Sequence, residues 1–355
     1  MVSTRGSWRS ALAVLGLIAS CDEPRDPCTG TACADASTDA SVDAATDSSV
    51  VDAAVPCYGP PGLYGDSTCT NLATGLVAYT PQYGLWSDGV TKQRFVYLPP
   101  AATIDTSDPD GWVYPVGTRL YKNFDVAGKH VETRMLEKVS VGEGAGSWQM
   151  RTFAWNVAQN RATEVLSGMS NVLGTAHDIP PVAACPTCHA SGMRDVALSF
   201  TAIQLNHANA GYTLGMLNAD GHLSQTIAPT DAVVPGNATE KAALGYLHAN
   251  CGPCHTGASA PPTSSPLRFW VPVGTATVAA TPTYTTAVGV TAVQTQPTRT
   301  LRIAPPNADA SMVVFRMSTR DSGAVPQWQM PPLATDMVDA NGVSAVSAWI
   351  ASIPP

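Results

Sequence analysis

Charged side chains are scarce in this sequence of 355 residues, where Asp, Glu, Lys and Arg together make up only 13%. So small a share argues against long solvated helices and coiled coils, while 29 Gly and 29 Pro favour loops and short strands. The length, together with 45% hydrophobic residues, excludes a disordered or fibrous chain and is enough for two or three domains.

Positive charge is also lacking from the body of the chain. The formal net charge is −8, and most of it lies in residues 21–55, where eight acids and a single Arg give −7. Residues 1–20 carry +2, which leaves −3 for residues 56–355. Because a nearly neutral body has no basic surface for phosphate contacts, we expect no nucleic-acid partner.

Long hydrophobic runs are absent too, since the apolar stretch at residues 11–19 is too short to span a bilayer. Its position after two arginines predicts an export signal over residues 1–20. The adjoining Ile18-Ala19-Ser20-Cys21 resembles the bacterial lipoprotein processing box. That resemblance implies a lipid on Cys21, which would anchor the protein to a membrane of the cell envelope. The alternative is an ordinary signal peptide followed by a chance cysteine.

Residues 21–56 are predicted to be a disordered tether behind this lipid. Within them, residues 34–55 contain five Asp, no Lys or Arg and no aromatic residue. Such a composition cannot bury enough apolar surface to offset the entropy of ordering. A flexible tether would let the folded body stand clear of the lipid headgroups.

Nine cysteines are present, and in an exported chain each needs a partner or a modification. Four of them form two C-x-x-C pairs, each followed by His. Of the rest, Cys21 is the predicted lipidation site, and Cys28, Cys33, Cys57 and Cys69 are predicted to form two disulfides. Their proximity in the sequence suggests that the disulfides join 28 to 33 and 57 to 69.

The two pairs belong to Cys185-Pro186-Thr187-Cys188-His189 and Cys251-Gly252-Pro253-Cys254-His255, both of the form C-x-x-C-H, which attaches a c-type haem. Two thiols one helical turn apart can both form thioethers with the haem vinyl groups, and the adjacent imidazole is the proximal ligand of the iron. We therefore predict two covalently bound haem c groups. The cofactor-binding residues are Cys185, Cys188, Cys251 and Cys254, and the iron ligands include His189 and His255.

Two other uses of these cysteines, in a zinc site or in a redox-active pair, are disfavoured. A zinc site is disfavoured because 62 residues separate the pairs and because an oxidising compartment disfavours free thiolates. A thioredoxin-like redox pair would need a βαβ context that neither copy shows.

The second haem segment, residues 236–355, begins with Asn237-Ala238-Thr239-Glu240, which predicts a capped helix start ahead of the motif. A helix with apolar residues at helical spacing is predicted at the C-terminus, comprising Val343, Val346, Trp349 and Ile350. Residues 256–310, which are rich in Thr, Val and Pro, are predicted to form a strand-rich insertion.

Just before the last helix lies Gln329-Met330-Pro331-Pro332, and this order of elements resembles a class I cytochrome c domain. The resemblance implies that Met330 supplies the sixth ligand of the second iron. Otherwise Met330, or Met337 or Met317 nearby, merely fills a gap in the core.

The first haem segment, residues 176–235, offers several distal ligands among which spacing does not choose. Met216 is the first choice, because it follows the motif far enough to cross the haem and lies in an apolar run. His207 is the second choice, and an open iron is the third. The remaining candidates are Met193, His177 and His222.

Residues 57–175 are predicted to form an antiparallel β-sandwich or barrel. Apolar and polar residues alternate with period two over 119–126 and over 131–139, which predicts half-buried strands joined by a hairpin at Ala127-Gly128. A third strand is predicted over Trp148 to Val157. Tryptophans at 86, 112, 148 and 155 could mark a binding face, but aromatic residues on strands more often pack inside.

From about residue 76 the chain resembles a group of exported bacterial dihaem c-type cytochromes with a β-rich front followed by two C-x-x-C-H segments. The resemblance implies redox work and no established substrate. It rests on Leu85-Trp86-Ser87-Asp88-Gly89, Phe95-Val96-Tyr97-Leu98-Pro99-Pro100, Pro115-Val116-Gly117-Thr118, Glu132-Thr133-Arg134-Met135-Leu136, Gln204-Leu205-Asn206 and Tyr246-Leu247-His248-Ala249-Asn250-Cys251.

The sequence thus predicts a multidomain β and α protein, a β-rich domain followed by two small, mainly helical haem segments. The leading functional prediction is a membrane-anchored electron-transfer protein with redox partners in the cell envelope. One alternative is a dihaem peroxidase or oxidase in which one iron keeps an open position. Another is a β-domain docking module whose haems serve as its redox partner.

Overall fold

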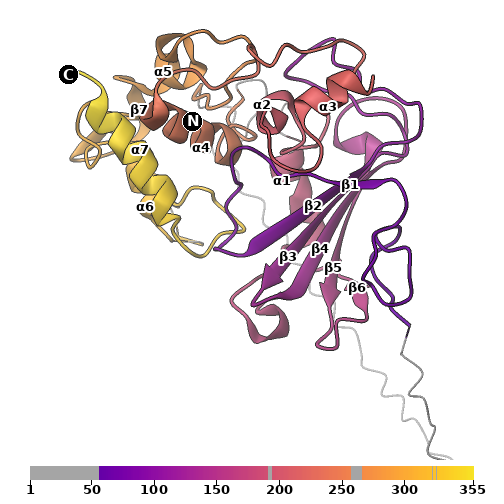
Figure 1. The fold of residues 1–355 in the computed structure, drawn as a ribbon. Helices are drawn as coiled ribbons and strands as arrows, with labels where there is room; N and C mark the ends of the chain where they lie inside the picture. The colour runs from indigo at the N-terminus through magenta and orange to yellow at the C-terminus, as the bar shows by residue number, and fades with distance from the viewer. Residues whose placement is uncertain (1–55, 191–193, 257–265, 322, 325) are drawn as a thin grey trace, which may run out of the picture. The chain divides into compact units, whose positions relative to one another are not determined.

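The computed structural model describes residues 56–190, 194–256, 266–321, 323–324 and 326–355. Its largest element is a six-stranded antiparallel sheet in which each strand pairs with the next one along the chain (Figure 1). The strands are β1 (Leu76–Ala78), β2 (Thr91–Tyr97), β3 (Arg119–Val126), β4 (Lys129–Lys138), β5 (Trp148–Trp155) and β6 (Ala162–Glu164). A mixed β and α protein with an antiparallel sheet is therefore confirmed.

The sheet is open, which corrects the expectation of a sandwich or barrel. Its edges are β1 and β6, of three residues each, and they do not pair with one another. Among the described residues the only other sheet is the two-stranded β7–β8. Strands this short present few unpaired backbone groups, so the edges need no closure into a barrel.

The predicted hairpin is present between β3 and β4. Ala127 and Gly128 form its two-residue turn with φ of 50° and 78°, as a type I′ turn requires. The predicted third strand is β5, which ends at Trp155. A register shift between Phe124 and Asp125 bends β3 near the turn.

Both faces of the sheet are covered, so the strands are not half-buried as predicted. In β3, successive side chains point to opposite faces, and yet Leu120 and Tyr121 are only 5% and 1% exposed. Leu120 belongs to a core that includes Phe200 and Trp349, from the segments that contain the first and the second C-x-x-C-H motif. On the opposite face Tyr121 packs against Leu63. The alternation of apolar and polar residues along these strands could not show which segments cover the two faces of the sheet.

The segment over that opposite face is closed by a disulfide between Cys57 and Cys69, which confirms one predicted pairing. Tryptophans 112, 148 and 155 are buried, which confirms packing as their role. Other predictions lie outside the described residues: the export signal, the lipidated Cys21 with its tether, and the pair formed by Cys28 and Cys33.

The helices follow the sheet in the sequence and gather beside it (Figure 1). The two longest, α4 and α7, pack together where a Cβ on Gly342 would come within 2.1 Å of the Tyr246 ring, so glycine permits the close approach. Within the described ranges, no helix is both long and apolar enough to cross a membrane. The helices are α1 (Cys185–His189), α2 (Ala202–Leu205), α3 (Leu214–Ala219), α4 (Ala238–Asn250), α5 (Pro282–Ala287), α6 (Met312–Ser318) and α7 (Ala340–Ser352).

The predicted strand-rich insertion contains less strand than expected. Its described part holds only β7 (Thr291–Gln296) and β8 (Arg299–Leu301), and it also contains α5. The threonines that suggested strands serve partly as helix caps. Thr281 accepts the backbone N–H of Tyr284 at the start of α5, where Pro282 is the first helical residue.

The capping box predicted at the start of α4 is present. The Asn237 side chain accepts the backbone N–H groups of Thr239 and Glu240, at 2.9 and 3.1 Å, and Glu240 Oε2 accepts the Asn237 N–H at 2.7 Å. We expect Asn237→Ala to lower the free energy of unfolding by about 1 kcal/mol, because two helix N–H groups lose their acceptor. Urea unfolding measures this, with Thr239→Ala as the control. Equal losses in both variants would contradict a specific contribution of the cap.

Candidate functional site

The second C-x-x-C-H motif begins where α4 ends. Cys251 is the C-terminal cap of the helix, and its N–H donates to the Leu247 carbonyl at 2.9 Å. The N–H of His255 in turn donates to the Cys251 carbonyl at 2.9 Å, so the motif winds through one further turn. A Cβ at Gly252 would lie 2.3 Å from the His248 carbonyl oxygen, so this turn requires glycine.

Cys251, Cys254 and His255 line a cavity of about 340 Å³, which lies in the range of roughly 300–1,000 Å³ that small-molecule and cofactor sites occupy. Much of its wall is apolar, including Leu267, Phe269 and Val313. The Phe269 ring stands edge-on to the His255 imidazole, with centroids 5.5 Å apart. The cavity thus offers two thiols and an imidazole against an apolar wall.

Burial keeps the His255 imidazole neutral. Desolvation lowers its pKa, and a hydrogen bond to the backbone of Leu267 opposes this shift. A neutral imidazole with one nitrogen bound to the backbone can offer the other to an iron.

Met330 lines the same cavity as His255, so the structure brings these two predicted ligands together. Met317 also lines it, and so does Met312, which the sequence did not single out. Met337, the other methionine near this loop, does not line the cavity and is 50% exposed.

The loop that carries Met330 is held by hydrogen bonds on both sides of it. The Met330 N–H donates to the Arg316 carbonyl at 3.0 Å. Asp321 accepts the N–H groups of Trp328 and Gln329 at 2.9 and 2.8 Å. The Gln329 side chain donates to the Thr335 carbonyl at 2.8 Å. These contacts fix the loop relative to α6 without using the Met330 side chain.

The first C-x-x-C-H motif forms α1, which lies against one face of the sheet. Cys185, Cys188 and His189 line a cavity of about 90 Å³ there. A second cavity, of about 400 Å³, shares five of its wall residues with the first. The shared residues are Arg134, Pro180, Ala184, Leu333 and Ala334. Leu333 and Ala334 come from the loop that carries Met330. This loop therefore lines the cavity of His189 as well as the cavity of His255.

His189 is oriented in the way that an iron ligand requires. Its Nδ1 donates to the Val196 carbonyl at 2.7 Å, which leaves Nε2 for the metal. Burial lowers the pKa of the imidazole to about 4, against the raising effect of that hydrogen bond. The ring is therefore neutral at physiological pH.

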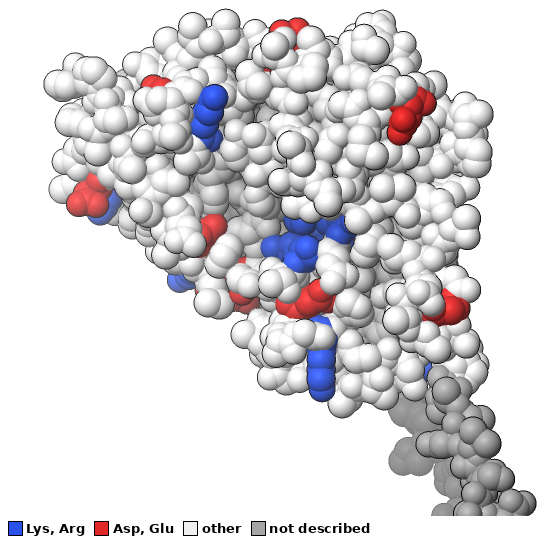
Figure 2. Space-filling view, in the orientation of Figure 1, with Lys and Arg blue, Asp and Glu red and all other residues white. Residues whose placement is uncertain are grey.

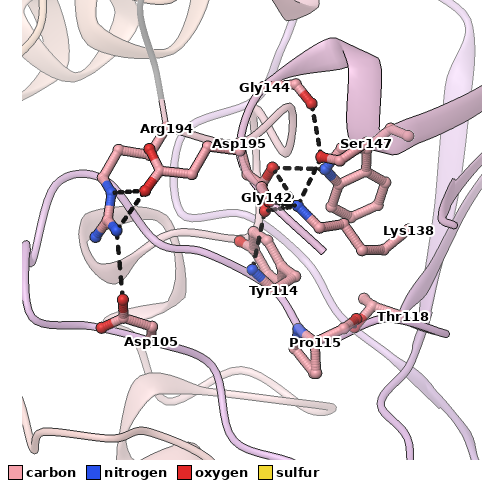
Figure 3. Close-up of polar contacts among 12 residues, drawn as sticks. Asp105, Tyr114, Pro115, Thr118, Lys138, Gly142, Gly144, Ser147, Arg194 and Asp195 are labelled. Carbon is pink, nitrogen blue, oxygen red and sulfur yellow. Dashed lines mark hydrogen bonds and ion pairs between the residues drawn. The ribbon is translucent and has the colours of Figure 1, made fainter. Parts of the chain in front are cut away.

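The residue before Val196 anchors this carbonyl through a buried ion pair (Figure 3). Lys138 Nζ lies 2.8 Å from both carboxylate oxygens of Asp195, and both residues are nearly fully buried. Asp195 also accepts the Trp148 Nε1–H at 2.7 Å and the Tyr114 N–H at 2.9 Å. Strand β4 thereby fixes the backbone that orients His189.

The structure does not bring the predicted distal ligands to the cavity beside His189. Met216, the first choice, is 43% exposed on α3 and lines neither cavity next to α1. His207 bonds to the Thr80 carbonyl. His222 contacts the Tyr212 hydroxyl, and Met193 lies outside the described residues.

His177 reaches only the larger of the two cavities beside α1. Its Nε2 is bound to Glu132 at 2.7 Å, so that nitrogen is already in use. Met150, on β5, does line the cavity of His189. Sequence reasoning missed Met150 because it searched only residues 176–235, and strand pairing across the sheet gave no local signal.

The two motifs touch each other although 61 residues separate them in the sequence. Cys254 Sγ lies 3.7 Å from the carbonyl oxygen of Thr187, inside the first motif. A hydrogen bond with Cys254 is the main reason why the pKa of Cys188 is raised, and burial adds to it. Thiols of both motifs therefore meet at one point.

The residues present suit two covalently attached haems. Each motif supplies two thiols and one neutral, buried imidazole. The cavity of Cys251, Cys254 and His255 adds a thioether from Met330. Within the residues that have been placed, no group of three or more His, Cys, Asp and Glu side chains could hold a bare metal ion.

The segment Leu85-Trp86-Ser87-Asp88-Gly89 joins the β-rich part to the second haem segment. The Trp86 N–H donates to Asn250 Oδ1 at 2.6 Å, directly before Cys251. Asp88 accepts the N–H groups of Asp336 and Met337 at 3.0 and 2.8 Å. This segment therefore links Asn250, in the wall of the cavity of His255, to Asp336 and Met337, which follow the loop that carries Met330. Comparison of the chain with protein-family models, with curated proteins and with solved structures found no match.

Proposed function

We propose that this protein is a dihaem c-type cytochrome that transfers electrons between its haems and redox partners in the cell envelope. The observation that carries the proposal is the meeting of the two C-x-x-C-H motifs at Cys188 and Cys254. Haems attached to these thiols would be close to each other, which favours electron exchange. The shared cavity of His255 and Met330 supports a six-coordinate second iron.

Haem c supplies a one-electron carrier, and the residues of this chain supply its attachment and its surroundings. Cys185 and Cys188 would hold the first haem and Cys251 and Cys254 the second. Rigid support of His189 through Val196 keeps the imidazole in place in both oxidation states, so little reorganisation accompanies electron transfer.

A methionine ligand favours a higher reduction potential than a second histidine does. If the first iron has no methionine ligand, Met330 would make the second haem the one of higher potential, and electrons would run from the first haem to the second. A redox titration with two identical low potentials would contradict this order.

The proposal is tested by a pyridine haemochrome spectrum together with the intact mass. We expect two haems per chain in the wild type, and one haem in each of the variants Cys185→Ser/Cys188→Ser and Cys251→Ser/Cys254→Ser, because each motif attaches its own haem. The control is Cys57→Ser/Cys69→Ser, which removes a disulfide and keeps both haems. Colourless protein, or a mass equal to the bare polypeptide plus acyl chains, would end the proposal.

The anchor and the location belong to the same proposal. A lipid on Cys21 would place the protein on the outer membrane or on the periplasmic face of the inner membrane, with the tether as a spacer. Mass spectrometry of the mature N-terminus tests this, and a terminus without an acyl chain would leave an ordinary exported protein.

A second candidate function is a peroxidase or oxidase whose first iron keeps an open position. It is favoured by the placement of Met216, His177, His207 and His222, which do not line the cavity beside His189. A high-spin signal and rapid reaction with peroxide or cyanide in the resting protein would select this candidate. Two low-spin irons would select electron transfer, with Met150 as the distal ligand that the structure offers.

A further inference from the structure

Three cationic residues form one row across the sheet face that lies under α1. Arg94 on β2 is paired in register with Lys122 on β3, and Lys122 is paired with Arg134 on β4. Direct partners on adjacent strands lie on the same face, about 4.8 Å apart in the hydrogen-bonding direction. Like charges placed in this way repel each other, so the row costs stability unless an anion offsets it.

The described residues provide too little negative charge for this row. Only Arg134 has a carboxylate partner, Glu132, at 2.7 Å through Nε and 3.1 Å through Nη2. That carboxylate also accepts a hydrogen bond from the Thr152 hydroxyl and is hydrogen-bonded to His177 Nε2, each at 2.7 Å. Each of its two oxygens therefore already has two partners. In the part of the chain that the structure describes, neither Arg94 nor Lys122 forms an ion pair with a carboxylate.

Arg94 is only 7% exposed, and its Nε is buried without a hydrogen-bond partner in the described structure. A further cation, Lys92, lies two residues earlier on the same strand and donates to the Leu85 carbonyl at 2.7 Å. The carboxylates of Asp88 and Asp339 attract Lys92, so the cations left with the single Glu132 carboxylate are the three of the row. Buried charge of one sign is stable only when it is paired, so the site calls for an additional anion.

Two of the three cations face the first C-x-x-C-H motif, while Arg94 lies beside Lys122 outside the wall of that cavity. Lys122, Arg134 and Glu132 line the same cavity as Cys185, Cys188 and His189. Next to the cations on this face run Leu120, Leu136 and Met150, which line the same cavity. Figure 2 shows a hollow in which Lys and Arg side chains gather, with Asp or Glu side chains directly beside them. A haem is a flat apolar ring with two propionate carboxylates on one edge. An apolar strip beside a cationic row therefore suits a haem.

We propose that Lys122 and Arg134 bind the two propionate carboxylates of the haem on Cys185 and Cys188, and that the whole Arg94–Lys122–Arg134 row raises the reduction potential of that haem. The inference rests on the proposed function and adds the role of the sheet to it. Positive charge next to the macrocycle stabilises the reduced iron, which carries one positive charge less. Pairing the propionates with the row also neutralises the repulsion among the cations.

The test is a spectroelectrochemical titration of the full-length dihaem protein carrying Lys122→Gln or Arg94→Gln. We expect the reduction equilibrium of one haem to fall about tenfold, which is about 59 mV for a one-electron couple, while the other haem keeps its potential. We also expect the resonance Raman bending vibrations of the propionates to shift. The control is Lys129→Gln, at the exposed start of β4, which should change neither property.

The outcomes separate this inference from the function on which it rests. Absence of haem in the wild type defeats the proposed function. Two haems with unchanged potentials and unchanged propionate vibrations in both variants overturn the row's role. If added formate or phosphate shifts the wild-type potential, and Lys122→Gln abolishes that shift, the row binds a free anion and the assignment to propionates is wrong.

Discussion

Replacing Lys138 with methionine is expected to lower the free energy of unfolding by about 3–5 kcal/mol, the largest loss that we foresee for one side chain. The substitution keeps the length of the side chain but leaves the Asp195 carboxylate buried without its counter-charge. Breaking one half of a buried ion pair is costly because the remaining charge cannot be solvated. Urea unfolding of the intact protein measures the loss.

The chain offers a matched control on the neighbouring strand. Arg151 pairs with Glu164 at 2.7 Å, but both side chains are partly exposed. Arg151→Met should therefore cost less than about 1 kcal/mol. The double variant Lys138→Met/Asp195→Asn should recover part of the loss, because no unpaired charge remains. Equal losses at Lys138 and Arg151 would contradict a special role for the buried pair.

The second large effect is expected from Met330→His, which should lower the reduction potential of the second haem by on the order of 0.1 V or more. Axial ligands set haem potentials over a range of roughly 0.8 V, and methionine lies on the high side of histidine. A redox titration measures the shift. The optical signature of a methionine–iron bond should disappear at the same time.

Two other methionines serve as controls for this assignment. Met317→Leu changes a methionine that lines the same cavity, and Met337→Leu changes one that does not. Both variants should keep the methionine–iron signature and the potential of the second haem. If Met317→Leu loses the signature and Met330→His keeps it, the ligand is Met317.

What the sequence could predict is what depends on neighbours along the chain. The capping box at Asn237 and the Ala127-Gly128 turn are set by residues a few positions apart, and both are present. The short disulfide between Cys57 and Cys69 is of the same kind. The attachment motifs themselves are local, since each fits within one helical turn.

What the sequence could not predict depends on pairing across the fold. Met150 reaches the cavity of His189 only because β5 lies beside β4, and the cationic row exists only through the register of three strands. The open sheet was mistaken for a sandwich or barrel because an alternating pattern shows that a face is covered and not what covers it. The contact between Cys254 and Thr187 likewise has no trace in local spacing.

The loop that carries Met330 also has a thermodynamic consequence. Its residues Leu333 and Ala334 form part of the wall beside His189, and Asp88 holds its far end. With both haems bound, a displacement of this loop when one iron changes its valence would be felt at the other iron. Linkage makes such an influence mutual and equal in free energy, so the two haems would titrate as one coupled system rather than as independent centres.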